Sequence, residues 1–271
     1  MKYHSSCPAC SQGKEDFDIA PITVEYFDTL GGTYKCRNGH ERYAVIQGPK
    51  FQVLMASGAE ALFAGFTLEA CTTFSAATER FYECMLKAML LKAGLKEELI
   101  ELQFKEMSRQ SERQLGAFMS QYAILTGTAF APSKKLTERR NEYVHKAVVP
   151  NPEAAMGYCS DVYDQILKCV LILKPLLLEE LQKVVVWETR QSRSKAPLGS
   201  EIELVASPGI FSLLSDSFPS FKESMEHYQT VQGFATSLGA IPQETVAMIR
   251  EQRLAQERWD SGLSEGISPK L

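Results

Sequence analysis

From about residue 56 onward, the apolar positions of the chain follow the spacing of helices. Over 57–94, and again over roughly 96–124, apolar residues recur at three- and four-residue steps, which places them on one face of a helix. Ser57 is a suitable N-cap for the first of these helices, and Gly94 is a suitable stop. Both segments are therefore predicted to form amphipathic helices that bury one side.

Two more helices are expected further along the chain. The charged stretch ERRNEYVH begins a third helix after Thr137, a good N-cap residue, and 127–135 before it has the composition of a loop. A fourth helix should run from about 152 to 187, with Pro175 kinking it or splitting it in two. Four helices that can pack antiparallel through short links are the elements of a helical bundle, so we predict a mainly α protein.

The two ends of the chain follow a different pattern. Residues 21–36 carry β-branched and aromatic residues around Gly31-Gly32, which indicates two short strands joined by a turn. After Trp187 a basic, polar segment has the composition of a linker. The remainder combines a short strand at 201–207, a weakly helical segment at 218–240 and an amphipathic helix at 242–261. These changes divide the chain into a β module (1–50), a helical bundle (51–188) and a linker with a mixed, partly helical C-terminal extension (189–271).

Composition narrows the class of protein. A chain of 271 residues with 45% hydrophobic content can bury a sizeable core, and a net charge of -4 argues against binding nucleic acid through bulk charge. The N-terminus lacks the apolar segment of a secretory signal. The most apolar run, 169–187, contains Lys174, Pro175, Glu179 and Glu180, which argues against a membrane span. We therefore expect a cytoplasmic protein with no membrane partner, whose seven cysteines stay reduced.

Four residues near the N-terminus have the spacing of a zinc site. Cys7 and Cys10 form a CxxC pair, and Cys36 and His40 form a CxxxH pair in which Gly39 can supply the tight turn. Two short strands between the pairs give the layout of a zinc ribbon, which is too small to fold without the metal. Four protein ligands leave no open position, so this zinc would be structural. A redox-active CxxC is the alternative, although no thioredoxin-like βαβ pattern surrounds it, and His4 ranks below His40 as a ligand.

Arg140, Asn141 and His145 form the second candidate site. On an α-helix they fall at about 0°, 100° and 140° around the axis, so all three can face one groove. Arginine provides a planar fork for phosphate, histidine transfers protons near neutral pH, and asparagine can orient the imidazole or bind phosphate. These groups suffice for cleavage of RNA through its 2′-hydroxyl without a catalytic cofactor. A charged helix start with a single histidine is also what an ordinary solvated surface looks like.

The segment RNEYVHKAVVPNPEAAMGYCSDVYDQIL resembles the signature of HEPN domains, in which R-N-x-x-x-H is followed by a proline-containing loop and a helix. ATERFYECMLKAML (77–90) resembles the aromatic, acidic helix of that family, and the resemblance covers roughly 57–187. It implies an antiparallel helical bundle that dimerises face to face. Many members are metal-independent endoribonucleases with a composite R-x4-H site, which makes Arg140 and His145 catalytic and Asn141 supporting. Glu79 and Arg80 are further candidates to approach the groove.

The resemblance also implies partners and a biological setting. RNA is the expected substrate, a homodimer the expected assembly, and a regulatory protein a further candidate partner, in a toxin or antiviral-defence effector. In one toxin–antitoxin subgroup a tyrosine stands two residues after the histidine as a modification site, whereas this sequence has Ala147 there. Two alternatives stay open: a catalytically silent HEPN dimer that binds RNA or protein, and a zinc-ribbon adaptor whose bundle is only a scaffold.

Overall fold

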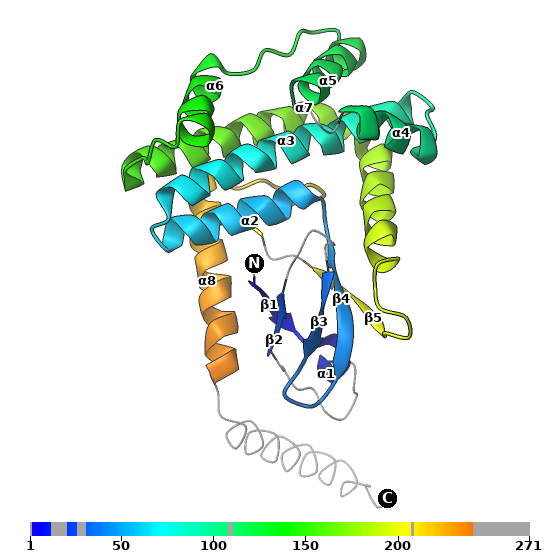
Figure 1. Ribbon diagram of the computed structural model, residues 1–271, viewed down its shortest axis with the longest axis vertical. Helices are drawn as coiled ribbons and strands as arrows, with labels where there is room; N and C mark the ends of the chain where they lie inside the picture. Colours follow the sequence, from blue (N-terminus) through cyan, green and yellow to red (C-terminus); the bar gives the residue numbers. More distant parts are fainter. Residues whose placement is uncertain (1, 12–20, 26–30, 108–110, 207–208, 241–271) are drawn as a thin grey trace, which may run out of the picture.

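The computed structural model describes residues 2–11, 21–25, 31–107, 111–206 and 209–240. The protein is mainly helical, with small β-sheets formed chiefly by its N-terminal part (Figure 1). In chain order the elements are β1 (Lys2–Ser6), α1 (Pro8–Ser11), β2 (Pro21–Glu25), β3 (Gly31–Lys35), β4 (Glu41–Gln47), α2 (Lys50–Phe63), α3 (Thr67–Lys92), α4 (Glu97–Met107), α5 (Ser111–Thr126), α6 (Lys134–Arg140), the π-helical turn η1 (Asn141–His145), α7 (Pro152–Arg193), β5 (Ile202–Ala206) and α8 (Phe221–Ala240).

The main core lies where α2, α3 and α7 pack side by side (Figure 1). Large side chains that are fully buried fill it, among them Phe51, Phe74, Phe81, Tyr158 and Tyr163. The other helices complete the layer: α5 and α6 pack on α3, and α8 contacts α7, β1 and β2. In the part of the chain that the structure describes, no helix is long and apolar enough to cross a membrane.

The helix predicted over 57–94 is in fact two helices. Gly65 has a φ of 78°, a left-handed conformation that a residue with a Cβ rarely adopts, and it ends α2 and starts the turn into α3. Ser57 consequently lies inside α2 rather than at a cap. Gly94 does end α3 as predicted, with a φ of 87°.

The later helices differ from the prediction mainly at their ends. α6 begins at Lys134 because the Ser133 hydroxyl accepts a hydrogen bond from the Leu136 amide, so Ser133, and not Thr137, is the N-cap. α7 continues to Arg193 with Pro175 inside it. Figure 1 shows its yellow-green second half turning away from the first. A proline inside a helix removes one backbone hydrogen bond and its ring crowds the preceding turn, which is consistent with this bend.

The strands form one antiparallel pair, β1–β2, and one three-stranded sheet in the order β3–β4–β5. Gly31 and Gly32 lie inside β3 and not in a turn. A Cβ on Gly31 would sit 2.6 Å from the Ala44 carbonyl oxygen of β4, so glycine allows a close approach of the two strands. The strand predicted near 201–207 is β5, which pairs parallel with β4 with Leu204 opposite Val45.

The C-terminal part of the chain makes further contacts with the helices. Gln52 Nε2 of α2 donates to the Phe211 carbonyl at 2.7 Å, and Tyr163 of α7 donates to the Pro219 carbonyl at 2.8 Å. α8 follows the helical segment predicted at 218–240. The amphipathic helix predicted at 242–261 lies outside the described residues.

Candidate functional site

Arg140 is the last residue of α6, and Asn141–His145 form the π turn that continues it. The Lys146 amide donates to the Asn141 carbonyl at 3.3 Å, which is the five-residue spacing of a π-helix. In an α-helix, residues five apart are rotated by about 140° from one another. The α-helical prediction already placed both residues toward one groove. The π turn, which was not predicted, brings Arg140 and His145 closer still to one face.

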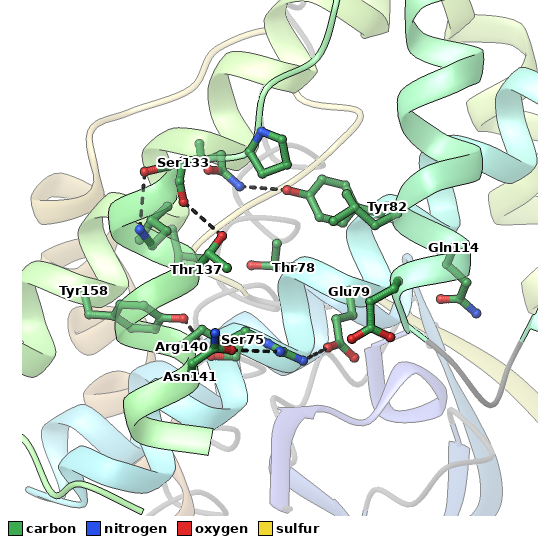
Figure 2. Close-up of a pocket in the computed structure, with 16 residues that line it drawn as sticks. Ser75, Thr78, Glu79, Tyr82, Gln114, Ser133, Thr137, Arg140, Asn141 and Tyr158 are labelled. Atoms are coloured by element: carbon green, nitrogen blue, oxygen red, sulfur yellow. Dashed lines mark hydrogen bonds and ion pairs between the residues drawn. The ribbon is translucent and has the colours of Figure 1, made fainter. Parts of the chain in front are cut away.

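The Arg140 guanidinium connects the polar side chains of this motif. Its Nη1 lies 3.2 Å from His145 Nε2. Nη1 also lies 3.5 Å from Asn141 Oδ1, and Nη2 donates to Glu79 Oε1 at 2.6 Å (Figure 2). Arginine can only donate, so in a hydrogen bond between the two side chains His145 Nε2 is the acceptor.

The neighbouring Arg139 has a different environment. It pairs with Asp161 of α7, and its guanidinium carbon lies 5.1 Å from the centre of the Tyr158 ring. Its side chain is 20% exposed. Arg139 therefore fastens α6 to α7, whereas Arg140 faces the polar groups of the motif.

Two contacts and one backbone conformation position the η1 segment. Tyr143 is buried, with its ring edge-on to Tyr158 at a centroid distance of 5.2 Å. Ala147 has a φ of 52°, an uncommon conformation that turns the chain away from the helix axis. Further on, the Thr67 hydroxyl donates to the Pro150 carbonyl at 2.8 Å. The buried side of the segment is thus held by the bundle, and Asn141 and His145 stay exposed.

A pocket of about 250 Å³ opens beside Arg140, between α3, α5, α6 and α7 (Figure 2). Arg140, Asn141 and Glu79 form part of its wall. The rest of the lining combines apolar side chains and hydroxyl groups with the carboxylate of Glu112 and the amides of Gln114 and Gln165. The apolar and hydroxyl groups include Leu115, Leu136, Val162, Thr78, Tyr82 and Thr137. His145 is not part of the lining, so Arg140 is the residue that connects the pocket with the histidine.

The motif and the pocket differ in how visible they are in the sequence. The structure brings Arg140 and His145 into contact and places Asn141 against Arg140. Of the two further candidates, Glu79 pairs with Arg140, while Arg80 turns to Glu83. The pocket wall was not predicted, because it is assembled from four helices. The one available signal was the four-residue spacing of polar side chains on α3, which puts them on one face.

The four predicted metal ligands also come together. The Sγ atoms of Cys7, Cys10 and Cys36 and a ring nitrogen of His40 all lie within 4.8 Å of one another, and the group could hold a metal ion. Cys10 Sγ is 3.8 Å from Cys36 Sγ, and His40 Nδ1 is 3.9, 3.2 and 3.4 Å from the three sulfurs in chain order. A tetrahedral zinc with Zn–S of about 2.3 Å and Zn–N of about 2.0–2.1 Å requires edges of about 3.8 Å and about 3.5 Å. The donor set therefore fits the ion.

The pKa values of two of the thiols bear on how the cluster would bind a cation. Burial raises the pKa of Cys10 to about 12; a hydrogen bond from Asn38 opposes this, and the neighbouring thiols add to it. Burial also raises the pKa of Cys36, but hydrogen bonds from the backbone of His40 and Asn38 and from the side chains of His40 and Cys10 outweigh it and bring this pKa to about 7. One thiol is thus prepared to ionise, and a cation among them would favour ionisation of the others.

A buried chain of polar groups connects this cluster with β5. Tyr34 donates its phenolic proton to Glu203 of β5, and its oxygen lies 3.7 Å from Cys7 Sγ. Arg42 pairs with the same carboxylate at 2.9 Å. Burial, together with the hydrogen bond to Glu203, raises the pKa of Tyr34, so the phenol keeps its proton. β5, a strand from the C-terminal part of the chain, thereby supports the ligand cluster through Glu203 and Tyr34.

Comparisons of the chain with protein-family models, with curated proteins and with solved structures found no match. The two clusters lie far apart, with α6 at the outer side of the helical layer and α1 among the strands (Figure 1). They therefore do not form one common site.

Proposed function

We propose that the chain is a HEPN-type endoribonuclease that cleaves RNA through the ribose 2′-hydroxyl, with Arg140 and His145 catalytic and Asn141 supporting. The observation that carries the proposal is the contact of 3.2 Å between Arg140 Nη1 and His145 Nε2 on an exposed π turn. A phosphate-binding cation and an imidazole within hydrogen-bond distance are the groups that this reaction requires.

In the proposed reaction the substrate phosphate takes over the Arg140 guanidinium, and the His145 Nε2 that this releases takes the proton of the 2′-hydroxyl. The 2′-oxygen then forms a bond to phosphorus while the bond from phosphorus to the 5′-oxygen breaks. Arg140 stabilises the additional negative charge on the phosphoryl oxygens, for which one well-placed donor contributes about 10²–10³ in rate. The 5′-oxygen leaves with a proton from a protonated imidazole, and the products carry a 2′,3′-cyclic phosphate and a 5′-hydroxyl.

This reaction uses two proton-transfer groups, whereas one chain supplies one histidine to the motif. We therefore propose a homodimer in which the motifs of two copies face each other across a two-fold axis. Exposed apolar side chains surround the motif and could be covered by the second copy: Val144, Val148, Val149 and Met156, of which Val149 is 69% exposed. Apolar residues next to an exposed polar site are typical of a surface that another protein covers.

The metal site has a structural role in this proposal. Zinc would be bound by Cys7, Cys10, Cys36 and His40, whose four ligands leave no position for water or substrate. Within the described residues, this is the one cluster of three or more potential metal ligands, and it does not include the residues around Arg140. Catalysis is proposed to need no metal ion, because the arginine would stabilise the phosphoryl charge and the imidazoles would transfer the protons. A toxin or antiviral-defence effector, controlled by a regulatory protein, is the proposed setting.

A silent HEPN dimer that binds RNA or protein is the second candidate. The observation in its favour is the ion pair of 2.6 Å between Arg140 and Glu79, which neutralises part of the charge that a phosphate would attract. In the first proposal the same carboxylate orients the guanidinium. The two candidates differ in one measurable property, because only the enzyme produces shorter RNA.

The test is cleavage of labelled single-stranded RNA by purified wild-type protein and by His145→Ala, with a matched all-DNA oligonucleotide. We expect the wild type to produce fragments with cyclic phosphate ends in the presence of EDTA and to leave DNA intact. The rate should fall at least about 10²-fold for His145→Ala, as expected for loss of a general acid–base group. His227→Ala is the matched control, because His227 is an exposed histidine on α8, away from the motif.

Thermal melting of each protein, with and without EDTA, separates loss of chemistry from loss of the metal-stabilised fold. Equal cleavage by wild type and His145→Ala would refute the assignment of the histidine. RNA binding without cleavage by either protein would favour the silent dimer.

A further inference from the structure

The pocket beside Arg140 has the dimensions of a site for one aromatic ring system. Its volume of about 250 Å³ exceeds the roughly 150 Å³ of an apolar cavity that holds benzene. It is smaller than the roughly 300–1,000 Å³ of pockets for drug-sized ligands. One nucleobase therefore fits, while a complete nucleotide would have to leave its sugar and phosphate at the mouth.

The lining combines apolar surface with polar groups. Leu115, Leu136 and Val162 provide apolar surface from three different helices. Figure 2 shows Thr78, Thr137 and Tyr82 around the same space, with Arg140 and Glu79 together at one side. A nucleobase has this distribution too, with two apolar faces and a hydrogen-bonding edge.

The hydroxyl groups of Thr78, Thr137 and Tyr82 have hydrogen-bonding capacities that follow from the bonds they already make. Thr78 donates its hydroxyl proton to the Phe74 carbonyl at 3.1 Å, and Thr137 donates its own to the Ser133 carbonyl at 3.1 Å. Both hydroxyl oxygens therefore present only lone pairs to a ligand.

The third hydroxyl group, that of Tyr82, can donate a hydrogen bond to a ligand. The Tyr82 oxygen accepts a hydrogen bond of 2.8 Å from Gln165 Nε2, and Tyr82 is 7% exposed. Burial raises the pKa of Tyr82, so its proton stays in place and is available to a ligand. These three hydroxyl groups thus offer the pocket two acceptors and one donor.

This pattern complements an amino group beside an unprotonated ring nitrogen, as found on adenine and cytosine. Uracil carries a carbonyl where cytosine carries the amine, so one of the threonine oxygens would face another acceptor. Arg140 lines the pocket and contacts His145, so a base in the pocket would belong to a nucleotide next to the phosphate at Arg140.

We propose that this pocket binds the unstacked base of a nucleotide adjoining the scissile phosphate, with adenine or cytosine preferred over uracil. The inference rests on the proposed ribonuclease function and names its substrate class, single-stranded RNA with an amino-bearing base at the cut. A base must leave its stack to enter such a pocket, which excludes regular duplex RNA.

The experiment maps cleavage sites of the full-length protein on a single-stranded RNA pool with randomised sequence. Wild type should cut next to adenine or cytosine about 5- to 150-fold above uracil, since an unpaired buried polar group has an effect of that size on discrimination. Thr78→Val removes one acceptor without changing the shape of the side chain, and the preference should fall toward equality. Thr72→Val is the matched control, because the Thr72 hydroxyl bonds to the Glu69 carbonyl on the same helix and does not line the pocket.

A second measurement does not depend on cleavage. Adenosine, cytidine and uridine are titrated into His145→Ala and into His145→Ala combined with Thr78→Val, and binding is followed by NMR. Binding of adenosine or cytidine but not uridine, weakened by Thr78→Val, supports the pocket even if no RNA is cut, in which case the proposed ribonuclease function fails alone. Cleavage without base preference, together with equal or absent binding of the three nucleosides, would overturn the pocket assignment and leave the ribonuclease function standing.

Discussion

Replacing each of two adjacent arginines by methionine should have opposite consequences, although the residues are neighbours in the sequence. Arg139 is 20% exposed, pairs with Asp161 and lies over the Tyr158 ring, whereas Arg140 reaches His145 and Glu79. Methionine keeps an unbranched side chain and removes the charge and all donors. The pair of variants therefore compares two side chains of the same type at consecutive positions.

The stability effects follow from these contacts. For Arg139→Met, a partly exposed ion pair contributes about 0.2–1 kcal/mol and a cation–π contact about 0.5–2 kcal/mol, so a loss of about 2 kcal/mol is expected. At about 2–4 °C per kcal/mol for a protein of this size, the Tm should fall by about 4–8 °C. Arg140→Met removes the ion pair with Glu79, worth about 0.5 kcal/mol, and the Tm should fall by about 1–2 °C.

The effects on RNA cleavage should be reversed. Arg140→Met should lower the rate by about 10²–10³, as expected for loss of a donor to the developing phosphoryl charge. Arg139→Met should cleave at the wild-type rate per folded molecule, measured well below its Tm. The assays are thermal melting by circular dichroism and single-turnover cleavage of one RNA. A Tm loss confined to Arg140→Met, or a rate loss confined to Arg139→Met, would refute the division of roles between them.

Four further variants test other parts of the structure. Burial lowers the pKa of Lys87, but its two glutamate partners, Glu83 and Glu188, outweigh burial and raise the pKa overall. The two ion pairs thus stabilise the fold at neutral pH, and this stabilisation is lost as the pH rises through the folded pKa of Lys87. Lys87→Met should therefore lower the free energy of unfolding in urea by about 3–5 kcal/mol at neutral pH, and an unchanged midpoint would contradict this. Gly31→Ala should cost about 1–3 kcal/mol in the same assay because its Cβ would meet the Ala44 carbonyl at 2.6 Å, whereas Gly116→Ala, with open space around it, should be neutral or stabilising. Cys36→Ser should reduce bound zinc, measured by mass spectrometry, from one per chain to a trace and lower the Tm, and full zinc content would exclude this thiol as a ligand.

Much of the secondary structure could be predicted from the sequence, because apolar spacing follows the periods of helices and strands. The N-terminal ligand spacing predicted a cluster of three cysteines and a histidine, and the structure brings those four residues together. The predictions failed where one local conformation overrides the pattern. Gly65 divides a continuous apolar period into two helices, and Gly31 stands inside a strand because a neighbouring backbone comes close.

The candidate site was less accessible to sequence reasoning. Arg140 and His145 could be paired by motif, but the π turn that brings them into contact has no distinct sequence period. The pocket could not be predicted, since its wall depends on the packing of α3, α5, α6 and α7. Tertiary packing decides which polar residues of a helix face a cavity, and that information is not contained in the periodicity of any one helix.

The parallel ladder between β4 and β5 has a consequence for biosynthesis. β4 ends at Gln47 and β5 starts at Ile202, so about 155 residues are translated between the two strands (202 minus 47). At about 5–20 residues per second, the edge of β4 waits roughly 8–30 s on the ribosome before its partner exists. During this interval the nascent chain carries an open strand edge, and Glu203 has not yet reached Tyr34 behind the cysteine cluster. The N-terminal module, although made first, would be among the last parts of the protein to mature.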